Sequence, residues 1–264
     1  MANSEEDLKK NGFAVFRSFF SDRQCQLISG MTARLEQACG TLITVENAIR
    51  PAKLDASIQR MIIKRDNLDA TKVQVVHNTL DVIPQLKYIS KGLIEPLLAQ
   101  LTGEEWCMSK DKFLVRGKGS VGTKPHQDIA SCDFDPNSGF FKSSRTLTVQ
   151  VSVDWADTGN ACMRYAANYM DVKHEINGTM PKDKYLPWVD ASGALLECVT
   201  EKLVWTDVET APNDLLVFDE YIPHTSGRND SNRTRKSFYL TYIPLRFTAT
   251  HDAYYKTTAR EMFK

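Results

Sequence analysis

The sequence lacks an excess of charge of either sign, because Lys and Arg together number 33 and Asp and Glu together also number 33. Proteins that hold nucleic acid through its phosphates need a surplus of Lys and Arg. No stretch of the sequence approaches the roughly 18 consecutive apolar residues of a membrane-spanning helix. We therefore expect neither a nucleic-acid partner nor a membrane partner.

Other absences narrow the class of protein further. The six cysteines are scattered and form no C-x-x-C pair, which indicates free thiols in a reducing compartment rather than a disulfide scaffold. Residues 1–7 are acidic and polar and lack the basic and apolar regions of a secretion signal. No repeat, low-complexity run or Pro/Gly/Ser-rich linker divides the sequence. We therefore expect a cytoplasmic protein with a single domain over residues 1–264.

The first hundred residues predict mainly helix. Ser4 precedes acidic residues as the cap of a first helix, which should end near Gly12. A short strand over 13–16 leads to a second helix with apolar residues at helical spacing, and a further amphipathic helix lies within 79–102. The apolar positions of these two helices are Leu27, Met31 and Leu35 in the former and Leu80, Ile83, Leu86 and Leu93 in the latter.

From residue 113 onward, short β-rich runs alternate with turn signals. The clearest run covers 146–153, where Leu and Val alternate strictly with Thr, Gln and Ser. The polar row could face water in a sheet with one solvated face, or it could line the interior of a barrel that holds a ligand. The sequence thus predicts a mainly β fold, with helices over about 1–105 packed on a sandwich or barrel over about 106–245. The other β-rich runs cover 113–115, 203–208, 215–218 and 237–243.

Histidine is scarce, and two of the five histidines occur in unusual contexts. His126 and Asp128 are two positions apart, and on an extended segment such residues point to the same face. His224 follows the run 215–223 (LLVFDEYIP), which begins as a core strand, and lies 98 residues after His126. Two His and one carboxylate form the facial triad of non-haem Fe(II) oxygenases, although zinc hydrolases use the same ligand types. The remaining histidines, which we expect to be structural or surface residues, are His77, His174 and His251.

A basic segment after His224 favours the oxygenase. Arg235 lies 11 residues beyond His224, at the entrance to the next predicted strand. A guanidinium group fixed there can hold a carboxylate with two parallel hydrogen bonds. A redox enzyme with a dicarboxylic acid cosubstrate needs such a group, whereas a zinc hydrolase does not. Arg233 is the competing candidate, and an exposed basic loop is the alternative interpretation; the spacing favours Arg235.

Several segments repeat the motifs of a known family. They are residues 11–21 (NGFAVFRSFFS), residues 108–113 (MSKDKF) followed by the His126–Asp128 motif, and residues 218–235, which run from Phe-Asp through His224 to Arg235. In this order and spacing they resemble the phytanoyl-CoA dioxygenase family of Fe(II)- and 2-oxoglutarate-dependent oxygenases. The resemblance implies a double-stranded β-helix, or jelly-roll barrel, with helices packed on it.

The resemblance also implies the roles of individual residues. Fe(II) would be bound by His126, Asp128 and His224, with 2-oxoglutarate and O2 as cosubstrates. Arg235 would hold the distal carboxylate of 2-oxoglutarate. The reaction would oxidise a C–H bond of a small-molecule metabolite by hydroxylation, desaturation or ring formation, and it would release succinate and CO2. Further contacts of the cosubstrate are expected from Ser226, Gln127 and Thr146, or from Thr148 in place of Thr146.

The sequence departs from the family pattern at one loop. Where the family continues with "nGcL" and a "PGSH" turn, residues 160–170 read NACMRYAANYM. This loop usually borders the substrate, so we expect an altered substrate wall at 161–170. The departure leaves a barrel that binds a metabolite without turnover as a further alternative.

The substrate is less defined than the reaction. Lys110 and Lys112 share one face of a predicted strand and could meet an anionic substrate, or they could guard a solvated edge strand. Residues 239–244 and Tyr254-Tyr255 resemble a subgroup that includes small aminoalkylphosphonate hydroxylases. We expect a small substrate that is anionic, zwitterionic or a natural-product intermediate, and a protein that is a monomer or a homodimer.

Overall fold

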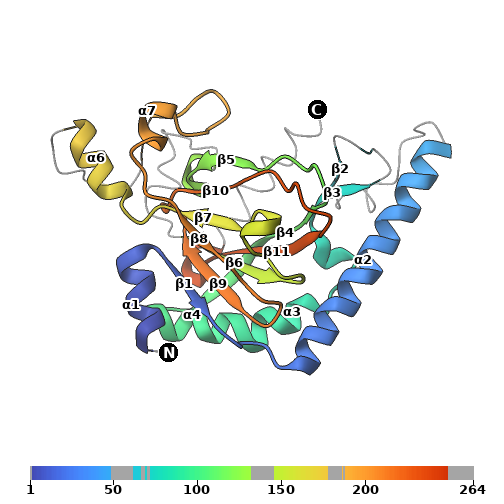
Figure 1. Ribbon diagram of the computed structural model, residues 1–264. Helices are drawn as coiled ribbons and strands as arrows, with labels where there is room; N and C mark the ends of the chain where they lie inside the picture. The colour runs from blue at the N-terminus through green and yellow to red at the C-terminus, as the bar shows by residue number, and fades with distance from the viewer. Residues whose placement is uncertain are drawn as a thin grey trace.

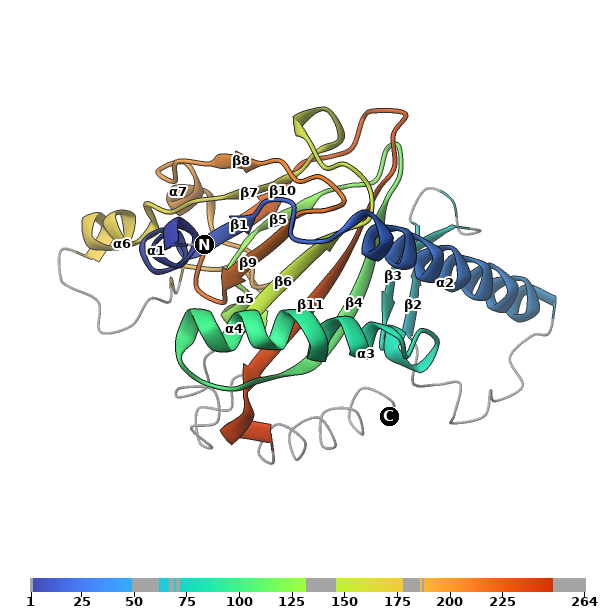
Figure 2. The same ribbon diagram turned by 90° about the horizontal axis from the view of Figure 1, so that it is seen from below.

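The computed structural model describes residues 2–48, 62–66, 69, 72–131, 146–177, 186 and 188–248. In these segments two antiparallel sheets are the centre of the molecule, and helices cover the outer face of the larger sheet (Figures 1 and 2). The mainly β fold with packed helices is therefore confirmed, and the paired sheets are consistent with a jelly roll. Tyr254, Tyr255 and His251 lie outside the described residues.

The larger sheet has seven strands, and β11 (Arg235–Pro244) and β4 (Trp106–Arg116) are the longest pair in it. Strand β4 starts earlier than the predicted run 113–115, because the charged residues within 106–112 conceal its alternation. Both neighbours of β11 are antiparallel to it. In spatial order the sheet contains β1 (Phe13–Phe16), β9 (Leu215–Asp219), β6 (Leu147–Ser152), β11, β4, β3 (Val73–His77) and β2 (Ile62–Arg65).

The smaller sheet has four short strands, three of which the sequence did not predict. Strand β10 (His224–Ser226) lies between β5 (Thr123–His126) and β7 (Met163–Tyr165), and β8 (Thr206–Val208) completes the sheet. The register pairs His224 with His126 on one side and with Tyr165 on the other. Strands of three or four residues carry too little alternation to be recognised, yet this pairing sets the geometry of the site.

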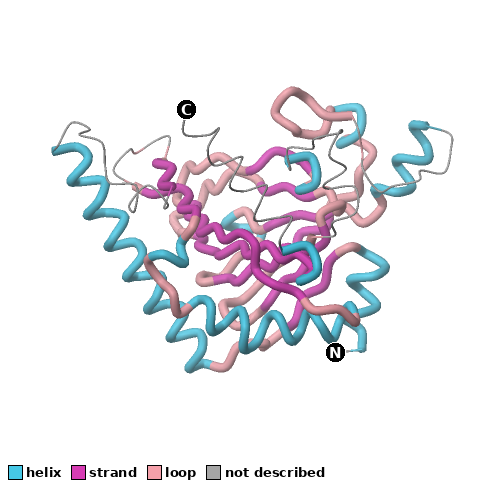
Figure 3. Tube along the Cα trace, turned by 180° about the vertical axis from the view of Figure 1, so that it is seen from behind, coloured by secondary structure: helices cyan, strands magenta, loops and turns pink. Residues whose placement is uncertain are grey.

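Helices pack along the outer face of the larger sheet, as the view from behind also shows (Figure 3). The predicted helix within 79–102 is built from several short pieces rather than one, and Pro84 separates its first turn from the rest. The helical segments of the described residues are α1 Ala2–Asn11, α2 Asp22–Ala48, η1 Thr79–Asp81, α3 Leu86–Ile89, η2 Ser90–Ile94, α4 Glu95–Thr102, α5 Asp128–Ser131, η3 Thr158–Asn160, α6 Tyr169–Asn177, α7 Glu197–Thr200 and η4 Leu245–Phe247.

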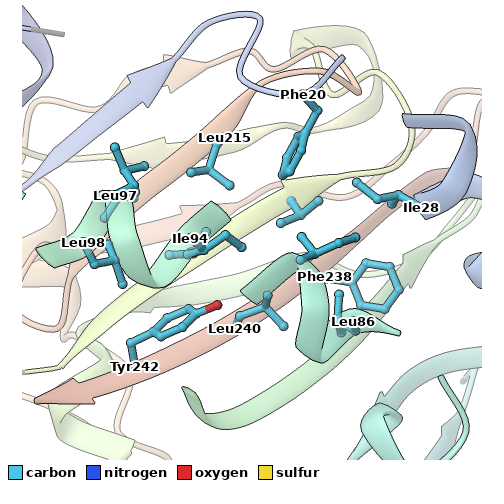
Figure 4. Close-up of a cluster of buried hydrophobic side chains, with 14 of the residues drawn as sticks. Phe20, Ile28, Leu86, Ile94, Leu97, Leu98, Leu215, Phe238, Leu240 and Tyr242 are labelled. Carbon is cyan, nitrogen blue, oxygen red and sulfur yellow. The ribbon is translucent and has the colours of Figure 1, made fainter. Parts of the chain in front are cut away.

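The main hydrophobic core lies between these helices and the larger sheet (Figure 4). The odd-numbered residues of β6 face it, as the alternation predicted, and they are fully buried. Tyr242 is also buried there, and its hydroxyl group donates a hydrogen bond to Ser90 Oγ at 2.9 Å. Each fully buried apolar side chain stabilises the fold by about 1.5–3 kcal/mol. Prominent members are Leu86, Ile94, Leu98, Leu147, Val149, Val151, Phe238 and Leu240.

The buried face of α2 differs from the prediction by one position. Ile28, Met31 and Leu35 face the core and are at most 4% exposed, whereas Leu27 is 51% exposed. A helix buries residues spaced three and four apart, and the spacing 28, 31, 35 fits this stripe as well as 27, 31, 35 does. The sequence alone could not separate the two stripes, and the choice of Leu27 was wrong.

The polar row of β6 faces the space between the two sheets, not water. Thr148, Gln150 and Ser152 are each no more than 3% exposed. Tyr165 of the smaller sheet and Phe218 of the larger sheet belong to a second cluster of buried residues on this inner side. Of the two interpretations of the alternating run, the interior one is therefore correct.

The larger sheet contains strands from both ends of the sequence. Strands β1, β2 and β3 come from the part predicted as mainly helical, and they join the strands that follow residue 106. A single domain over residues 1–264 stays a prediction. Over the described residues, no helix combines the length and the apolar character that crossing a membrane requires.

Candidate metal centre

Two imidazoles meet at the end of β5 and the beginning of β10. His126 and His224 are register partners, and their ring centroids are 4.2 Å apart. Asp128 is the first residue of α5, so the prediction of an extended segment from His126 through Asp128 was wrong. The chain turns after His126, and the carboxylate still returns to the imidazoles.

The three predicted metal ligands converge on one point. Oδ1 of Asp128 lies 3.6 Å from Nε2 of His126 and also 3.6 Å from Nε2 of His224. One donor atom from each residue lies within 4.8 Å of the other two. Such a spacing allows one divalent ion to contact two nitrogens and one oxygen while its other positions stay open.

Both histidines are held with Nε2 toward the common point. Nδ1 of His126 lies 2.9 Å from the Lys124 carbonyl oxygen, and Nδ1 of His224 lies 3.0 Å from the Ile222 carbonyl oxygen. A carbonyl can only accept, so each Nδ1 carries the proton and each Nε2 offers a lone pair. Metal-binding histidines are commonly oriented by a hydrogen bond of this kind. The donor chemistry therefore fits a divalent metal.

The local charges favour the protonation states that a metal requires. Burial alone would raise the pKa of Asp128, but His224, His126 and Lys112 together lower this pKa well below its usual range. Burial and repulsion by His126 lower the pKa of His224 to about 4. Near neutral pH the centre thus holds an ionised carboxylate and a neutral imidazole at position 224. Thr148 supports the carboxylate, because its hydroxyl group donates a hydrogen bond to Asp128 Oδ2 at 3.1 Å.

Arg235 begins β11 and points into the space between the sheets. It is only 2% exposed, and its Nε and Nη1 atoms have no hydrogen-bond partner. Directly across the sheet is Arg116, which is also buried and donates from Nη2 to Thr123 Oγ1 at 3.0 Å. Burial and the charge of Arg235 lower the pKa of Arg116. A buried guanidinium group without an anion is unfavourable, so this pair fits an anionic ligand.

The competing candidate Arg233 lies outside the site. Its Nη1 and Nη2 atoms make ion pairs with the carboxylate of Asp157 at 2.7 and 2.6 Å, and its side chain is about half exposed. Arg235, two positions later, is the first residue of β11 and is buried. The position that the spacing favoured is therefore the one that points inward.

The other predicted cosubstrate residues hold different positions. Ser226 is buried on β10, and its Oγ accepts a hydrogen bond from the Thr123 amide at 3.2 Å. Gln127 is buried between two backbone segments: its side-chain amide donates to the Tyr221 carbonyl, and Oε1 accepts from the Leu186 amide. The hydroxyl group of Thr146 donates a hydrogen bond to Glu220 rather than to a residue of the triad. These contacts give Gln127 and Thr146 a part in supporting the frame of the site.

Sequence reasoning missed two tyrosines. Tyr165, in the loop that departs from the family pattern, packs its ring against His224 with centroids 5.9 Å apart. Its hydroxyl group is buried without a hydrogen-bond partner, and the same is true of Tyr239 on β11. Residues 161–170 were expected to border the site, and Tyr165 is the residue of this loop that contacts His224. The three-residue strand β7 is too short for its pattern to have revealed this.

Several unpartnered polar groups face the same interior. Burial is complete for the atoms concerned, and a buried polar group without a partner normally signals a missing ligand or water. Tyr165 packs on His224, and the charge of Arg235 acts on the pKa of Tyr165, so the guanidinium group lies on the side of the triad. The unpartnered groups belong to Arg235, Ser237 and Tyr239 on β11, Gln150 on β6 and Tyr165 on β7. A dicarboxylate between the metal position and Arg235 would accept hydrogen bonds from the guanidinium and hydroxyl groups, whereas Gln150 Oε1 is itself an acceptor.

Two curated relatives are named for phosphonate substrates. A 2-aminoethylphosphonate dioxygenase of the uncultured bacterium HF130_AEPn_1 is 29% identical over 168 residues, which are 63% of this chain and 57% of that protein. A methylphosphonate hydroxylase of Gimesia maris is 26% identical over 172 residues, which are 65% of this chain and 58% of that protein. The chain thus spans less than two thirds of the length of these relatives.

Solved structures with the same fold include iron- and 2-oxoglutarate-related enzymes. EctD from S. alaskensis with 2-oxoglutarate and 5-hydroxyectoine has a TM-score of 0.67 at 14% identity, covering 93% of this chain and 77% of that one. The alpha ketoglutarate dependent carbocyclase SnoK from nogalamycin biosynthesis has a TM-score of 0.65 at 12% identity, covering 92% and 84%. At these identities the likeness shows the fold.

The family model described as phytanoyl-CoA dioxygenase matches residues 8–237. This range contains every residue of the triad, as well as Arg235 and Tyr165. The match therefore covers most of the sequence and all three predicted metal ligands. It confirms the resemblance found in the sequence motifs: the chain belongs to the phytanoyl-CoA dioxygenase family.

Proposed function

We propose that this protein is an Fe(II)- and 2-oxoglutarate-dependent oxygenase that hydroxylates a C–H bond of a small organophosphonate. One observation carries the first part of the proposal, the convergence of two imidazole Nε2 atoms and one carboxylate oxygen beside a buried, unpartnered Arg235. The family assignment supports the same reaction class.

In this proposal each residue of the centre has a defined part. His126, His224 and Asp128 bind the iron through Nε2, Nε2 and Oδ1. Bound Fe(II) and 2-oxoglutarate supply the oxidising chemistry, in which one atom of O2 enters succinate and the other enters the substrate while CO2 is released. Thr148 fixes the orientation of the carboxylate through its hydrogen bond to Oδ2.

Arg235 is the proposed partner of the distal carboxylate of 2-oxoglutarate. Its Nε and Nη1 atoms are buried without hydrogen-bond partners, so the guanidinium group keeps donors available for a carboxylate. Ser226, Tyr165 and Tyr239 present hydroxyl groups on the inner strand faces nearby. A zinc hydrolase would leave Arg235 and these hydroxyl groups without a role, which favours the oxygenase over that alternative.

The substrate class rests on different support. Both curated relatives are named for phosphonates, and each alignment covers less than two thirds of the relative. Lys110 and Lys112 lie on β4, which is an inner strand between β11 and β3. The alternative of a lysine-guarded edge strand therefore does not hold, and the inward lysine, Lys112, suits an anionic substrate.

The test is consumption of 2-oxoglutarate by the purified protein. Succinate should form with Fe(II) and O2, and 2-aminoethylphosphonate or methylphosphonate should increase the rate. His224→Ala should abolish this activity, while Arg233→Gln, which removes a surface charge, should keep it. Binding of 2-oxoglutarate by the wild type without any succinate formation across the panel would instead support a binding protein.

A further inference from the structure

A row of basic residues lies on the inner face of the larger sheet, beyond the metal centre. Lys112 on β4 is directly opposite His77 on β3, and such partners have Cβ atoms about 5 Å apart. Lys110 shares the face of Lys112 because it is two positions away on the same strand. Lys64 on β2 pairs with Val75, two positions from His77, and so joins the same face. We refer to Lys64, His77, Lys110 and Lys112 as the basic cluster.

The cluster faces the reaction centre through Lys112. Its ammonium group lies over the ring of Tyr239, 5.3 Å from the centroid. Lys112 is also near enough to Asp128 to help lower the pKa of this carboxylate. An anion held at Lys112 would therefore lie on the side of the sheet where the metal ligands converge.

The charges of the basic cluster are poorly compensated. Burial, and then repulsion from Lys110, Arg116 and Lys64, lower the pKa of Lys112, although Asp128 attracts it. Burial and the lysines Lys110, Lys112 and Lys64 lower the pKa of His77 to about 4. Near neutral pH His77 is therefore uncharged, and the repulsion is among the lysines, which a bound anion would relieve.

No ion pair within 4 Å relieves this repulsion among the described residues. The buried carboxylate on the same strand, Asp111, points to the opposite face and accepts hydrogen bonds from Thr79. By contrast Lys72, in the turn between β2 and β3, pairs with Asp69 at 3.0 Å, as surface lysines commonly do. Lys112 is only partly exposed and makes no such ion pair, which distinguishes it from a surface lysine, while Lys64 and Lys110 form the exposed margin of the basic cluster.

We propose that the basic cluster binds the anionic head group of the substrate, with Lys112 as the central contact and His77 as an additional N–H donor. Several cations at one place favour a doubly charged head group, such as a phosphonate, over a singly charged sulfonate or carboxylate. The inference rests on the proposed function and adds the residues that select the substrate. It also gives a role to His77, which the sequence predicted to be a structural or surface residue.

The test measures binding of a phosphonate to the protein loaded with Fe(II) and 2-oxoglutarate under anaerobic conditions. The probe is 2-aminoethylphosphonate at about pH 8, above the second ionisation of a phosphate-like group near 6. Taurine and β-alanine are matched probes that carry a sulfonate or a carboxylate in its place. Calorimetry on Lys112→Gln, Lys112→Arg and His77→Gln is compared with Lys72→Gln, which removes an equal charge outside the cluster.

We expect the wild type to bind the phosphonate at least tenfold more tightly than either singly charged probe. Lys112→Gln should weaken phosphonate binding at least tenfold, Lys112→Arg should restore part of it, and Lys72→Gln should match the wild type. Lys112→Gln should also raise the melting temperature of the anion-free protein, because it removes the repulsion. This readout shows that the variant still folds.

Two results would overturn the inference. One is equal phosphonate affinity in Lys112→Gln and the wild type, and the other is a wild type that consumes 2-oxoglutarate but binds no phosphonate. The proposed function fails separately, if the wild type forms no succinate from 2-oxoglutarate with Fe(II) and O2. Phosphonate binding that depends on Lys112 in such a protein would support the cluster and reject the oxygenase.

Discussion

Arg235 and Arg116 lie directly opposite each other on β11 and β4, and both guanidinium groups are buried. Two adjacent buried cations repel each other, and neither Nε atom has a hydrogen-bond partner. This arrangement is unfavourable in the free protein and favourable once a carboxylate is bound. The proposed cosubstrate site is thus arranged so that a bound anion relieves a repulsion that lowers the stability of the free protein.

Arg235→Gln should separate these two effects. Loss of the charge relieves the repulsion, while loss of a charge-assisted pair of hydrogen bonds, about 1.5–3 kcal/mol, weakens 2-oxoglutarate binding about 10- to 100-fold. Titration calorimetry with 2-oxoglutarate measures the affinity. Arg235→Lys should bind with intermediate affinity, because lysine keeps the positive charge but lacks the paired N–H donors of the guanidinium group. Unchanged affinity in Arg235→Gln would exclude the proposed role, and Arg233→Gln is the matched control.

Asp128→Ala should remove most of the metal affinity. It takes away the one ionised ligand and leaves two neutral imidazoles whose Nε2 atoms still converge. We expect the dissociation constant for Mn(II), used as an air-stable substitute for Fe(II), to rise at least 100-fold. Asp157→Ala removes a carboxylate that pairs with Arg233 on the surface and should leave metal binding unchanged. Equal Mn(II) binding by both variants would place the metal elsewhere.

Glu220 makes stability depend on pH. It is 1% exposed, and burial raises its pKa from 4.5 to about 8 although Thr146 donates two hydrogen bonds to it. A carboxyl group with a raised pKa in the folded state stabilises the protein fully below about pH 4.5, and this contribution is lost as the pH rises to about 8.

Glu220→Gln keeps a hydrogen-bond acceptor for Thr146 and cannot ionise. The wild type loses stability between about pH 5 and pH 8, and Glu220→Gln does not. The free energy of unfolding of Glu220→Gln relative to the wild type should therefore rise by a few kcal/mol over this range and then level off, and its melting temperature should follow. Thermal unfolding over this pH range gives the difference. Glu201→Gln, at an exposed position, should show no such trend. A constant difference between Glu220→Gln and the wild type would mean that Glu220 is ionised throughout.

Tyr165→Phe should change binding and stability in opposite directions. The ring contact with His224 is kept, while a buried hydroxyl group without a partner is removed. The free protein should gain up to about 1 kcal/mol of stability, because an unsatisfied polar group is no longer buried. Affinity for 2-oxoglutarate should fall severalfold if this hydroxyl group donates to the cosubstrate. Loss of stability in Tyr165→Phe would show that the hydroxyl group has a partner in the free protein.

Gly122 allows β5 and β10 to approach each other. A Cβ atom at this position would overlap the carbonyl oxygens of Ser226 and Gly227. Gly122→Ala should therefore separate the strands that carry His126 and His224, which lowers both the melting temperature and the affinity for Mn(II). Gly30→Ala is the control, since a Cβ there has open space and alanine favours the α2 helix. A melting temperature for Gly122→Ala equal to that of the wild type would contradict this packing.

The parts of the fold that the sequence predicted are those with strong periodicity. The helix 22–48 and the alternating strand around Leu147–Ser152 were recognised because each pattern extends over several residues. The sequence did not reveal which α2 stripe is buried, nor the strands β2, β3, β5, β7 and β10. Their identity depends on pairing between distant segments, and local patterns carry little of that information.

The residues of the candidate site were likewise predictable where a local motif identifies them, and not where pairing between distant strands does. His126, Asp128, His224 and Arg235 could be proposed because the motif fixes their spacing along the chain. Tyr165 and His77 could not, because their importance comes from the strands opposite them, His224 in one case and Lys112 in the other. The direction of side chains at Gln127 and Thr146 also depended on tertiary contacts.

The most direct test of the oxygenase proposal is the origin of the oxygen in succinate. The protein is incubated with Fe(II), 2-oxoglutarate, 2-aminoethylphosphonate and oxygen-18 gas, and the products are analysed by mass spectrometry. One oxygen-18 atom in succinate and one in a hydroxylated product, both absent in His224→Ala, are the predicted result. Succinate without oxygen-18, or substrate conversion that continues without O2, would contradict the account.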